Sequence, residues 1–290
     1  MRVLIIGGSG FIGKQLVLHA PNNVDLTYSF FSSPLQNPDI SSIKLDLLDK
    51  DLKWDRIIEG FDAIMISARP NGDTKSKRDI VASKTAESLQ MLVDSIRNSK
   101  KKPFLVAIHG SLSYGDRGDD LVQVSPDINP IGFAESYAIG EKPIRDYYDQ
   151  MGMAAIIRAP WVLGKGSWYQ GMYGSPDKIP YFAKNPWMSI VDSVALAKSA
   201  WDCLLKSEPG IFHPILTYRC RQNDFAEIVK SVTKKTLVKQ GWFRLLSYES
   251  QMKNSVLASI KLDDQQGDAS EKETARKSLV LKIKHIHSDF

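Results

Sequence analysis

Short apolar runs alternate with amphipathic stretches along roughly the first half of the chain. The runs that predict strands are Val3–Ile6, Val24–Phe30, Ile43–Leu45, Ala63–Ser67, Phe104–His109 and Ala154–Arg158. Helical segments lie between most of them. The clearest runs from about Asp79 to Asn98, with apolar residues on one side and charges on the other. Strands alternating with helices are typical of βαβ units, so we predict an α/β fold with a doubly wound parallel sheet.

The pattern changes after Pro160. Residues 164–186 are rich in glycine, proline and aromatic side chains and have little periodicity, which is typical of a loop-rich lobe. Further along, the pattern predicts helices at Val191–Leu205 and Asp224–Thr233, and a polar surface loop or disordered stretch at Asp263–Ser278. We therefore expect a core domain over residues 1–160 and a small C-terminal lobe over residues 161–290, with segments that return to the core.

Composition narrows the class of protein. The chain has 290 residues, of which 43% are hydrophobic, so it can bury a substantial core. Its 38 basic and 33 acidic residues are scattered, and we expect no nucleic-acid partner. Strand Val3–Ile6 is too short for a signal-peptide core, and no apolar run is long enough to cross a bilayer. With two cysteines, Cys203 and Cys220, in no metal-ligand spacing, we expect a cytoplasmic protein in a reducing compartment.

The first strand is followed by Gly7-Gly8-Ser9-Gly10-Phe11-Ile12-Gly13, which then opens a helix. In a Rossmann fold, three glycines at the spacing of Gly7, Gly10 and Gly13 make the tight turn, admit the pyrophosphate and allow close helix packing. The amides and dipole of the helix N-terminus hold the phosphates. We predict that residues 7–13, including Phe11 and Ile12, bind the pyrophosphate of NAD or NADP.

The second strand ends in Ser29-Phe30-Phe31-Ser32-Ser33, without an acidic residue to bind a ribose 2′-hydroxyl. Ser32 and Ser33 can face a 2′-phosphate instead, which favours NADP, although no arginine is present and NAD stays an alternative. Asp46 and Leu47 follow the third strand, where Asp46 either accepts from the adenine amino group or is a solvated strand-end carboxylate.

These motifs, in this order, resemble the extended or atypical short-chain dehydrogenase/reductase family, which includes NAD-dependent sugar epimerases and dehydratases. The resemblance covers most of the chain. It rests on the glycine loop and on five further segments: Leu45-Asp46-Leu47, Ile66-Ser67-Ala68, Ser111–Gly115, Arg158–Gly164 and Met188–Ala195. It implies that Ser67, Ala68, Pro160 and Val162 also contact the cofactor, and that the later segments bind substrate. A homodimer is compatible with it.

Family members pair a serine or threonine after the fifth strand with a Tyr-x-x-x-Lys motif on the next helix. The serine bonds the substrate oxygen, the tyrosine exchanges its proton and the lysine assists the tyrosine. Ser111, or else Ser113, fits the first role, and Tyr137 fits the second. The fourth residue after Tyr137 is Glu141 rather than lysine.

Two lysines are candidates for the missing cation. Lys142 points about 100° away from the required direction on a regular helix. Lys84 aligns with the family's active-site asparagine, but such a lysine is also typical of an exposed helical face. We therefore expect Ser111, Tyr137 and Lys84 as the catalytic set. Tyr147 and Tyr148 are expected to pack.

The remaining candidates carry weaker signals. His109 ends the fifth strand and is either structural or an acid–base group. His285 and His287 would face one side of a strand, and no metal site is expected there. Aromatic residues between Trp161 and Trp187 form either the lobe core or the wall of a pocket for a ring-containing substrate.

A carboxylate in place of the lysine makes tyrosinate harder to form, and oxidation needs such a base whereas reduction needs only a neutral proton donor. The sequence thus predicts an NADPH-dependent reductase acting on a carbonyl of a small, ring-containing metabolite. The alternatives are a sugar-nucleotide epimerase or dehydratase and a non-catalytic NADP-binding sensor or assembly subunit.

Overall fold

The computed structural model describes residues 1–37, 39–240, 248–263 and 269–288. The chain forms two compact units. The first comprises residues 1–109, 135–158 and 197–212, and the second comprises residues 110–134, 159–196 and 213–290. Residues 110–134 therefore belong with the second unit, and residues 197–212 return to the first.

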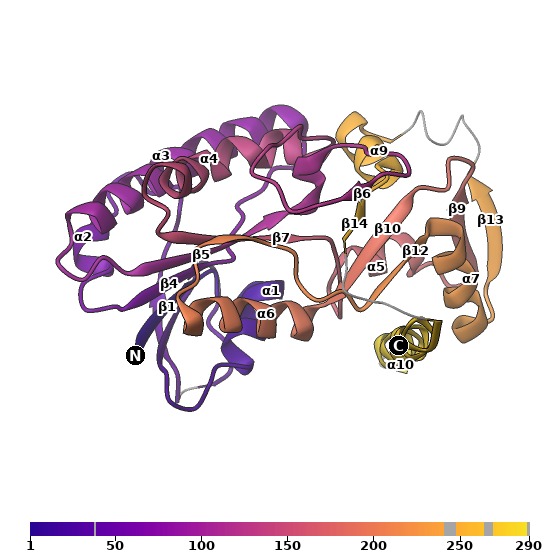
Figure 1. Ribbon diagram of the computed structural model, residues 1–290, viewed down its shortest axis with the longest axis horizontal. Coiled ribbons are helices and arrows are strands. Elements are labelled where there is room, and N and C mark those ends of the chain that lie inside the picture. Colours follow the sequence, from indigo (N-terminus) through magenta and orange to yellow (C-terminus); the bar gives the residue numbers. More distant parts are fainter. Residues whose placement is uncertain (38, 241–247, 264–268, 289–290) are drawn as a thin grey trace. The chain divides into compact units, whose positions relative to one another are not determined.

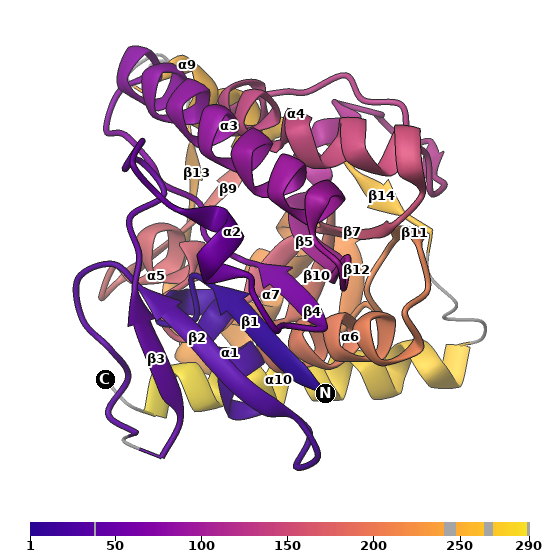
Figure 2. The ribbon, with the colours of Figure 1, turned by 90° about the vertical axis from the view of Figure 1, so that its left-hand side faces the viewer.

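The first unit contains a seven-stranded sheet in the order β11-β7-β5-β4-β1-β2-β3. Its strands are β1 (Arg2–Ile6), β2 (Asp25–Phe30), β3 (Ser41–Lys44), β4 (Ala63–Ile66), β5 (Phe104–Gly110), β7 (Ala154–Ala159) and β11 (Gly210–Phe212). The neighbours β1 and β2, β2 and β3, β1 and β4, β4 and β5, and β7 and β11 are parallel. Helices cover both faces (Figures 1 and 2). The predicted α/β doubly wound Rossmann fold is confirmed.

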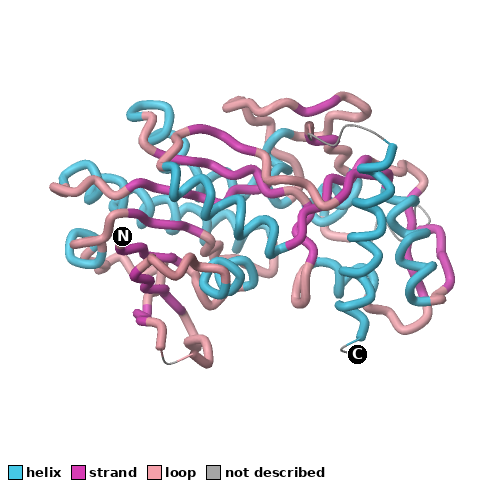
Figure 3. The backbone as a smooth tube through the Cα atoms, turned by 60° about the horizontal axis from the view of Figure 1, so that its bottom comes forward, coloured by secondary structure: helices cyan, strands magenta, loops and turns pink. Residues whose placement is uncertain are grey.

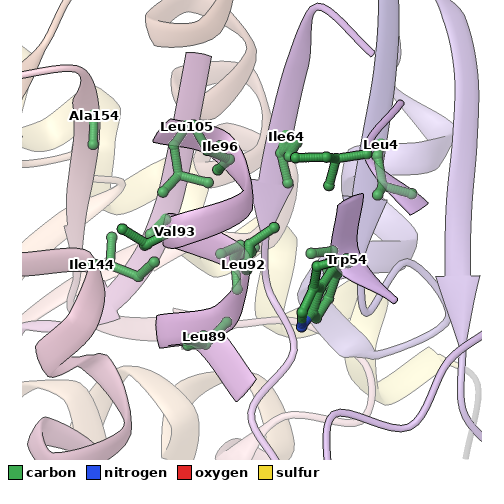
Figure 4. Close-up of a cluster of buried hydrophobic side chains, with 14 of the residues drawn as sticks. Leu4, Trp54, Ile64, Leu89, Leu92, Val93, Ile96, Leu105, Ile144 and Ala154 are labelled. Atoms are coloured by element: carbon green, nitrogen blue, oxygen red, sulfur yellow. The ribbon is translucent and has the colours of Figure 1, made fainter. Parts of the chain in front are cut away.

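Helices α3 (Lys75–Asn98) and α4 (Phe133–Met151) cover one face of the sheet, with the short α2 (Trp54–Ile57) beside α3. Side chains from these helices interdigitate with alternate strand residues in one buried cluster (Figure 4). The cluster includes Leu4, Trp54, Ile64, Leu89, Leu92, Val93, Ile96, Leu105, Ile144 and Ala154. The opposite face carries α1 (Phe11–Leu18) and α6 (Ser193–Lys206), which are joined where the Trp201 indole donates to the Leu16 carbonyl at 2.9 Å. Because both faces are covered, the central strands β1, β4, β5 and β7 are mostly apolar, whereas the edge strand β3 is mostly polar.

The second unit is built from short strands and helices. Its elements are the 3₁₀ turn η1 (Ser111–Tyr114), β6 (Leu121–Val122), β8 (Trp161–Leu163), α5 (Trp168–Tyr173), β9 (Lys178–Phe182), β10 (Trp187–Asp192), β12 (Tyr218–Arg221), α7 (Gln222–Thr233), β13 (Thr236–Gln240), α9 (Ser250–Leu257), β14 (Lys261–Leu262) and α10 (Ala269–Ser288). The strands pair as β12-β10-β8, β13-β9 and β14-β6. Helix α10, which leads to the C-terminus in Figure 3, packs against α7.

Three sequence expectations are corrected here. Helix α3 begins four residues before Asp79, because the Thr74 hydroxyl caps it by accepting from the Lys77 amide. Residues 269–278, expected as loop or disorder, are the first part of α10, although residues 264–268 of that stretch lie outside the described part. His285 and His287 also lie on α10 rather than on a strand.

The start of α10 was missed because residues 272–278 are mostly polar and exposed. Leu279, Ile283 and Ile286, spaced three and four residues apart, are buried in the core of the second unit and anchor the helix there. The same core contains Tyr169 and Tyr173, so these two aromatic residues are structural.

Candidate functional site

The glycine loop lies between β1 and α1. Strands β2 and β3 lie on one side of β1 in the sheet, and β4, β5, β7 and β11 lie on the other side. The loop therefore lies at the point where the strand order reverses, which is where dinucleotides bind in such sheets. Gly7 has φ +85°, a conformation that favours glycine. A Cβ on Gly13 would lie 2.0 Å from the Gly7 carbonyl oxygen, so only glycine fits there. Gly10 is the N-cap of α1 and offers no side chain to occupy the first amides of the helix.

The surroundings of the loop fit a dinucleotide pyrophosphate. The Gly7 amide donates to the Ser29 hydroxyl at 2.9 Å, and the Ser67 hydroxyl lies 3.2–3.3 Å from the carbonyls of Ile6 and Gly7. These contacts fix the loop against β2 and β4. The first turn of α1 contains no acidic residue, so its amides and its dipole favour an anion. The residues present thus match what a nicotinamide dinucleotide requires.

Gly10 and Gly13 should respond differently to substitution. A Cβ on Gly10 would meet only the Gly7 carbonyl, at 3.2 Å, whereas a Cβ on Gly13 would clash severely with the same group. We expect Gly10→Val to lower the melting temperature less than Gly13→Ala does but to lose NADPH binding, and Gly13→Ala to lower both. Thermal unfolding and calorimetric titration measure the two effects. Unchanged NADPH affinity in Gly10→Val contradicts the site.

Some of the residues expected to bind the adenosine end of the cofactor are exposed, and others are buried or make hydrogen bonds within the protein. Ser32 and Ser33 are exposed directly after β2, and the Phe31 ring beside them is 64% exposed. Asp46 accepts from the Leu48 amide at 2.9 Å, so one of its carboxylate oxygens stabilises the turn after β3. Leu47 is buried. The carboxyl ends of β2 and β3 therefore offer hydroxyls and an exposed ring.

A pocket that is open to the surface lies in the first unit between the sheet, α3 and α4. Its lining residues are Ile66, Ala68, Arg69, Pro70, Ala82, Thr85, Leu89, Ile108, His109, Tyr137, Gly140, Glu141 and Ile144. Ala68 borders both this pocket and the glycine loop, because its Cα lies 2.6 Å from the position of a Cβ on Gly7. Most of the wall is apolar, and Arg69, Thr85, His109, Tyr137 and Glu141 supply its charged and polar groups.

Glu141 is the centre of a buried charge cluster, which we call the Glu141 cluster. It consists of Arg69, His109, Glu141, Arg145 and Arg158. One carboxylate oxygen lies 3.3 Å from Arg69 Nη2, and the other lies 3.4 Å from His109 Nδ1 and 3.9 Å from a guanidinium nitrogen each of Arg145 and Arg158. Arg158 is fully buried in β7, so its charge requires a compensating carboxylate. Glu141 is therefore a structural counter-ion.

His109 is held neutral within this cluster. Burial lowers its pKa well below the ordinary value of 6.5, and the positive charges of Arg158, Arg69 and Arg145 lower it further. The adjacent Glu141 carboxylate favours the protonated ring, but burial and three guanidinium groups outweigh one carboxylate. The structural interpretation of His109 thus gains support over an acid–base role near neutral pH.

This neutral histidine should make the fold sensitive to acid. Below pH 6.5 the unfolded chain takes up a proton at His109 that the folded chain does not, so the free energy of unfolding falls as the pH drops, by at most about 1.4 kcal/mol per pH unit. Above pH 6.5 the contribution is constant. We expect His109→Gln to show a shallower loss than the wild type in urea unfolding between pH 7 and pH 5. His285→Gln, at an exposed position, is the control. Parallel losses in wild type and His109→Gln would refute the assignment.

The other predicted site residues are distributed as follows. Lys84 is exposed on α3 and does not line the pocket, and Lys142 is exposed and pairs with Asp146 on its own helix. Ser111 belongs to the second unit, where it is buried at the start of η1. Pro160 and Val162 also belong to the second unit, at the start of β8.

Sequence reasoning missed the three arginines of the Glu141 cluster. Arg69 follows β4, Arg145 lies one turn after Glu141, and Arg158 lies in β7. A signal existed in the sequence. Arg158 directly follows the apolar run Ala-Ala-Ile-Ile, and His109 directly follows the apolar run Phe-Leu-Val-Ala-Ile. A charged residue inside a strand that is covered on both faces must have a partner.

The parallel sheet with a glycine loop at the end of its first strand defines a nicotinamide-dinucleotide-binding Rossmann protein. The sequence profile of the NAD dependent epimerase/dehydratase family matches residues 3–185, well over half of the chain. The chain therefore belongs to this family of NAD(P)-dependent enzymes, as the resemblance of its motifs implied. No curated protein is similar enough in sequence to count as a match.

Solved structures share the fold at low sequence identity. The human epimerase family protein SDR39U1 (isoform 2) with NADPH has a TM-score of 0.74 and 16% identity, with both chains fully covered. A UDP-N-acetylglucosamine 4-epimerase from Methanobrevibacter ruminantium M1 has a TM-score of 0.73 and 17% identity over 100% of this chain and 99% of that chain. A hypothetical dTDP-4-dehydrorhamnose reductase from Sulfolobus tokodaii has a TM-score of 0.70 and 19% identity over 93% and 99%. Among the described residues, no helix combines the length and the apolar character that crossing a membrane requires.

Proposed function

We propose that the chain is an NADPH-dependent reductase that reduces a carbonyl group of a small, ring-containing metabolite. The observation that carries this proposal is the position of Tyr137. It lines a pocket that shares Ala68 with the glycine loop, with the Arg69 guanidinium carbon 4.5 Å from the centre of its ring.

Tyr137 is the proposed proton donor to the carbonyl oxygen. A tyrosine hydroxyl is ordinarily protonated near neutral pH, which suits reduction, whereas an oxidation would need it as a base. Ser111, directly after β5, is the proposed hydrogen-bond donor to the same oxygen. Gly7, Gly10 and Gly13 would hold the cofactor's pyrophosphate, and Ser67 and Ala68 border that loop. When bound, the cofactor supplies the hydride.

The charges beside Tyr137 suit the chemistry of a carbonyl group. None of the residues lining the described pocket is a lysine, and the position where the family has one is occupied by Glu141, which is engaged in ion pairs. The cluster holds three guanidinium groups and one carboxylate, and the guanidinium of Arg69 lines the pocket itself. A positive charge there stabilises the negative charge that develops on a carbonyl oxygen as its carbon receives a hydride.

Two of the structural neighbours support a sugar-like substrate, because their names state reactions on nucleotide-linked sugars. The protein from Sulfolobus tokodaii is named as a reductase of a dehydro sugar. These names support a ring with a carbonyl group, as in a keto sugar. The largely apolar lining of the pocket is compatible with the face of such a ring.

The direct test is consumption of NADPH in the presence of cyclic carbonyl compounds, including keto sugars linked to nucleotides.

We also expect tighter binding of NADPH than of NADH, because exposed Ser32 and Ser33 can donate to a 2′-phosphate and the end of β2 carries no carboxylate to repel it. Fluorescence titration of both cofactors measures this preference. A clear NADH preference contradicts the cofactor assignment.

A further inference from the structure

The guanidinium of Arg69 lies against the ring of Tyr137. The distance from its central carbon to the ring centre is 4.5 Å, within the range of a cation–π contact. Arg69 comes from the segment after β4, whereas Tyr137 comes from α4. Both side chains line the pocket, and the Arg69 side chain is 39% exposed.

Glu141 fixes Arg69 in this place. Its two carboxylate oxygens serve different partners, since Oε1 accepts from Arg69 Nη2 at 3.3 Å and Oε2 faces the more deeply buried groups of the cluster. Glu141 lies one helical turn after Tyr137 on α4, so the two side chains share a helix face. One turn of α4 therefore supplies both partners of the Arg69 guanidinium, namely the Tyr137 ring and the Glu141 carboxylate.

We propose that Arg69 is the positioning residue of Tyr137 and that Glu141 acts as its anchor. The inference rests on the proposed function. As the hydroxyl proton of Tyr137 passes to the carbonyl oxygen and the carbonyl carbon gains the hydride, the guanidinium compensates the negative charge left on the tyrosine oxygen. A proton from solvent then restores the hydroxyl. The positive charge is supplied by the segment after β4 rather than by a lysine on α4.

The two lysines considered from the sequence do not compete for this role. Lys84 is exposed on α3, and Lys142 pairs with Asp146 on the outer side of α4. Neither lines the pocket. Arg145 and Arg158 contact the same carboxylate as Arg69 does but are likewise outside the lining, which leaves Arg69 as the one arginine of the Glu141 cluster in the pocket wall.

A double-mutant cycle tests whether Arg69 acts through Tyr137. We expect Arg69→Met to lower kcat about 10- to 100-fold, from the loss of one charge beside the ring of the proton donor, with KM for the carbonyl compound changed by less than about threefold. In a Tyr137→Phe background the same substitution should have no further effect on kcat. Arg69→Lys should restore most of the rate because it keeps the charge. Arg97→Met, which removes a guanidinium that lies over the ring of Tyr147 outside the pocket lining, is the matched control and should leave kcat unchanged.

A second readout needs neither cofactor nor substrate. If Glu141 anchors Arg69, urea unfolding of the cofactor-free protein should show coupling between the two residues. We expect Arg69→Met to lower the free energy of unfolding in the wild type. In the Glu141→Gln background, the same substitution should have no such effect, because Arg69 has already lost its partner there. Additive effects on unfolding would overturn the anchor. A full effect of Arg69→Met on kcat in the Tyr137→Phe background would overturn the positioning role alone. Unchanged activity of Tyr137→Phe would overturn the proposed proton donor as well.

Discussion

Tyr137→Phe is expected to lower kcat for carbonyl reduction by about 10²- to 10⁴-fold, the loss typical when a general acid is removed. The substitution deletes only the hydroxyl, so the ring still fills its place in the pocket wall beneath the guanidinium of Arg69. Melting temperature and NADPH affinity should therefore stay close to wild type. Steady-state kinetics together with thermal unfolding separate the chemical effect from a structural one.

Tyr148→Phe is the matched control. Tyr148 lies on the same helix, is half-buried against the first unit's core and does not line the pocket. Its loss of a hydroxyl should leave kcat within about twofold. A loss of less than tenfold in Tyr137→Phe would mean that another group donates the proton, such as a water molecule, and that reduction depends chiefly on the placement of the carbonyl.

Glu141→Gln is expected to lower the free energy of unfolding by about 3–5 kcal/mol, because removing one partner of a buried ion pair leaves charge without compensation. Here the Glu141 carboxylate faces the guanidinium groups of Arg69, Arg145 and Arg158, the last of them fully buried. Urea unfolding of the purified variant measures the loss. The effect should be larger than that of any single exposed ion pair in the protein.

Glu141→Lys should be the worst substitution at this position. From the sequence, it restores the family's lysine and should favour oxidation of the product alcohol. In the structure, it adds a fourth cation to three guanidinium groups, so we expect little folded protein. Asp146→Asn is the control, because it removes a carboxylate from an exposed pair on the same helix and should cost about 1 kcal/mol or less. A stable, active Glu141→Lys would show that Glu141 is not the counter-ion of the cluster.

The fold could be predicted in large part because its signals are local. Apolar strands such as Val3–Ile6 and Ala154–Arg158 lie within the strands of the structure, and the glycine spacing at residues 7–13 identified the loop before α1. The start of α3 was placed late because Thr74, its cap, precedes the apolar periodicity. The start of α10 was missed because its first turns are polar, and only its packing against the second unit's core reveals the helix.

The candidate site was less predictable because its contacts are not local. Tyr137 and Glu141 were singled out through their motif, but the partners that decide what Glu141 does come from three other places in the chain, namely the segment after β4, β5 and β7. No spacing in the sequence connects Arg69 to Tyr137. The replacement of the lysine suggested an unfavourable carboxylate, whereas the structure surrounds that carboxylate with cations.

The most direct test of the central claim is the fate of a labelled hydride. The protein is incubated with NADPH carrying deuterium at the transferable position of C4 and with a cyclic keto compound, and the product is analysed by mass spectrometry. We expect one deuterium per product molecule, bound to the carbon of the new alcohol, with stoichiometric oxidation of NADPH. Conversion of a sugar without net NADPH oxidation would indicate an epimerase, and binding of NADPH without any turnover would indicate a sensor. Either result would contradict the assignment as a reductase.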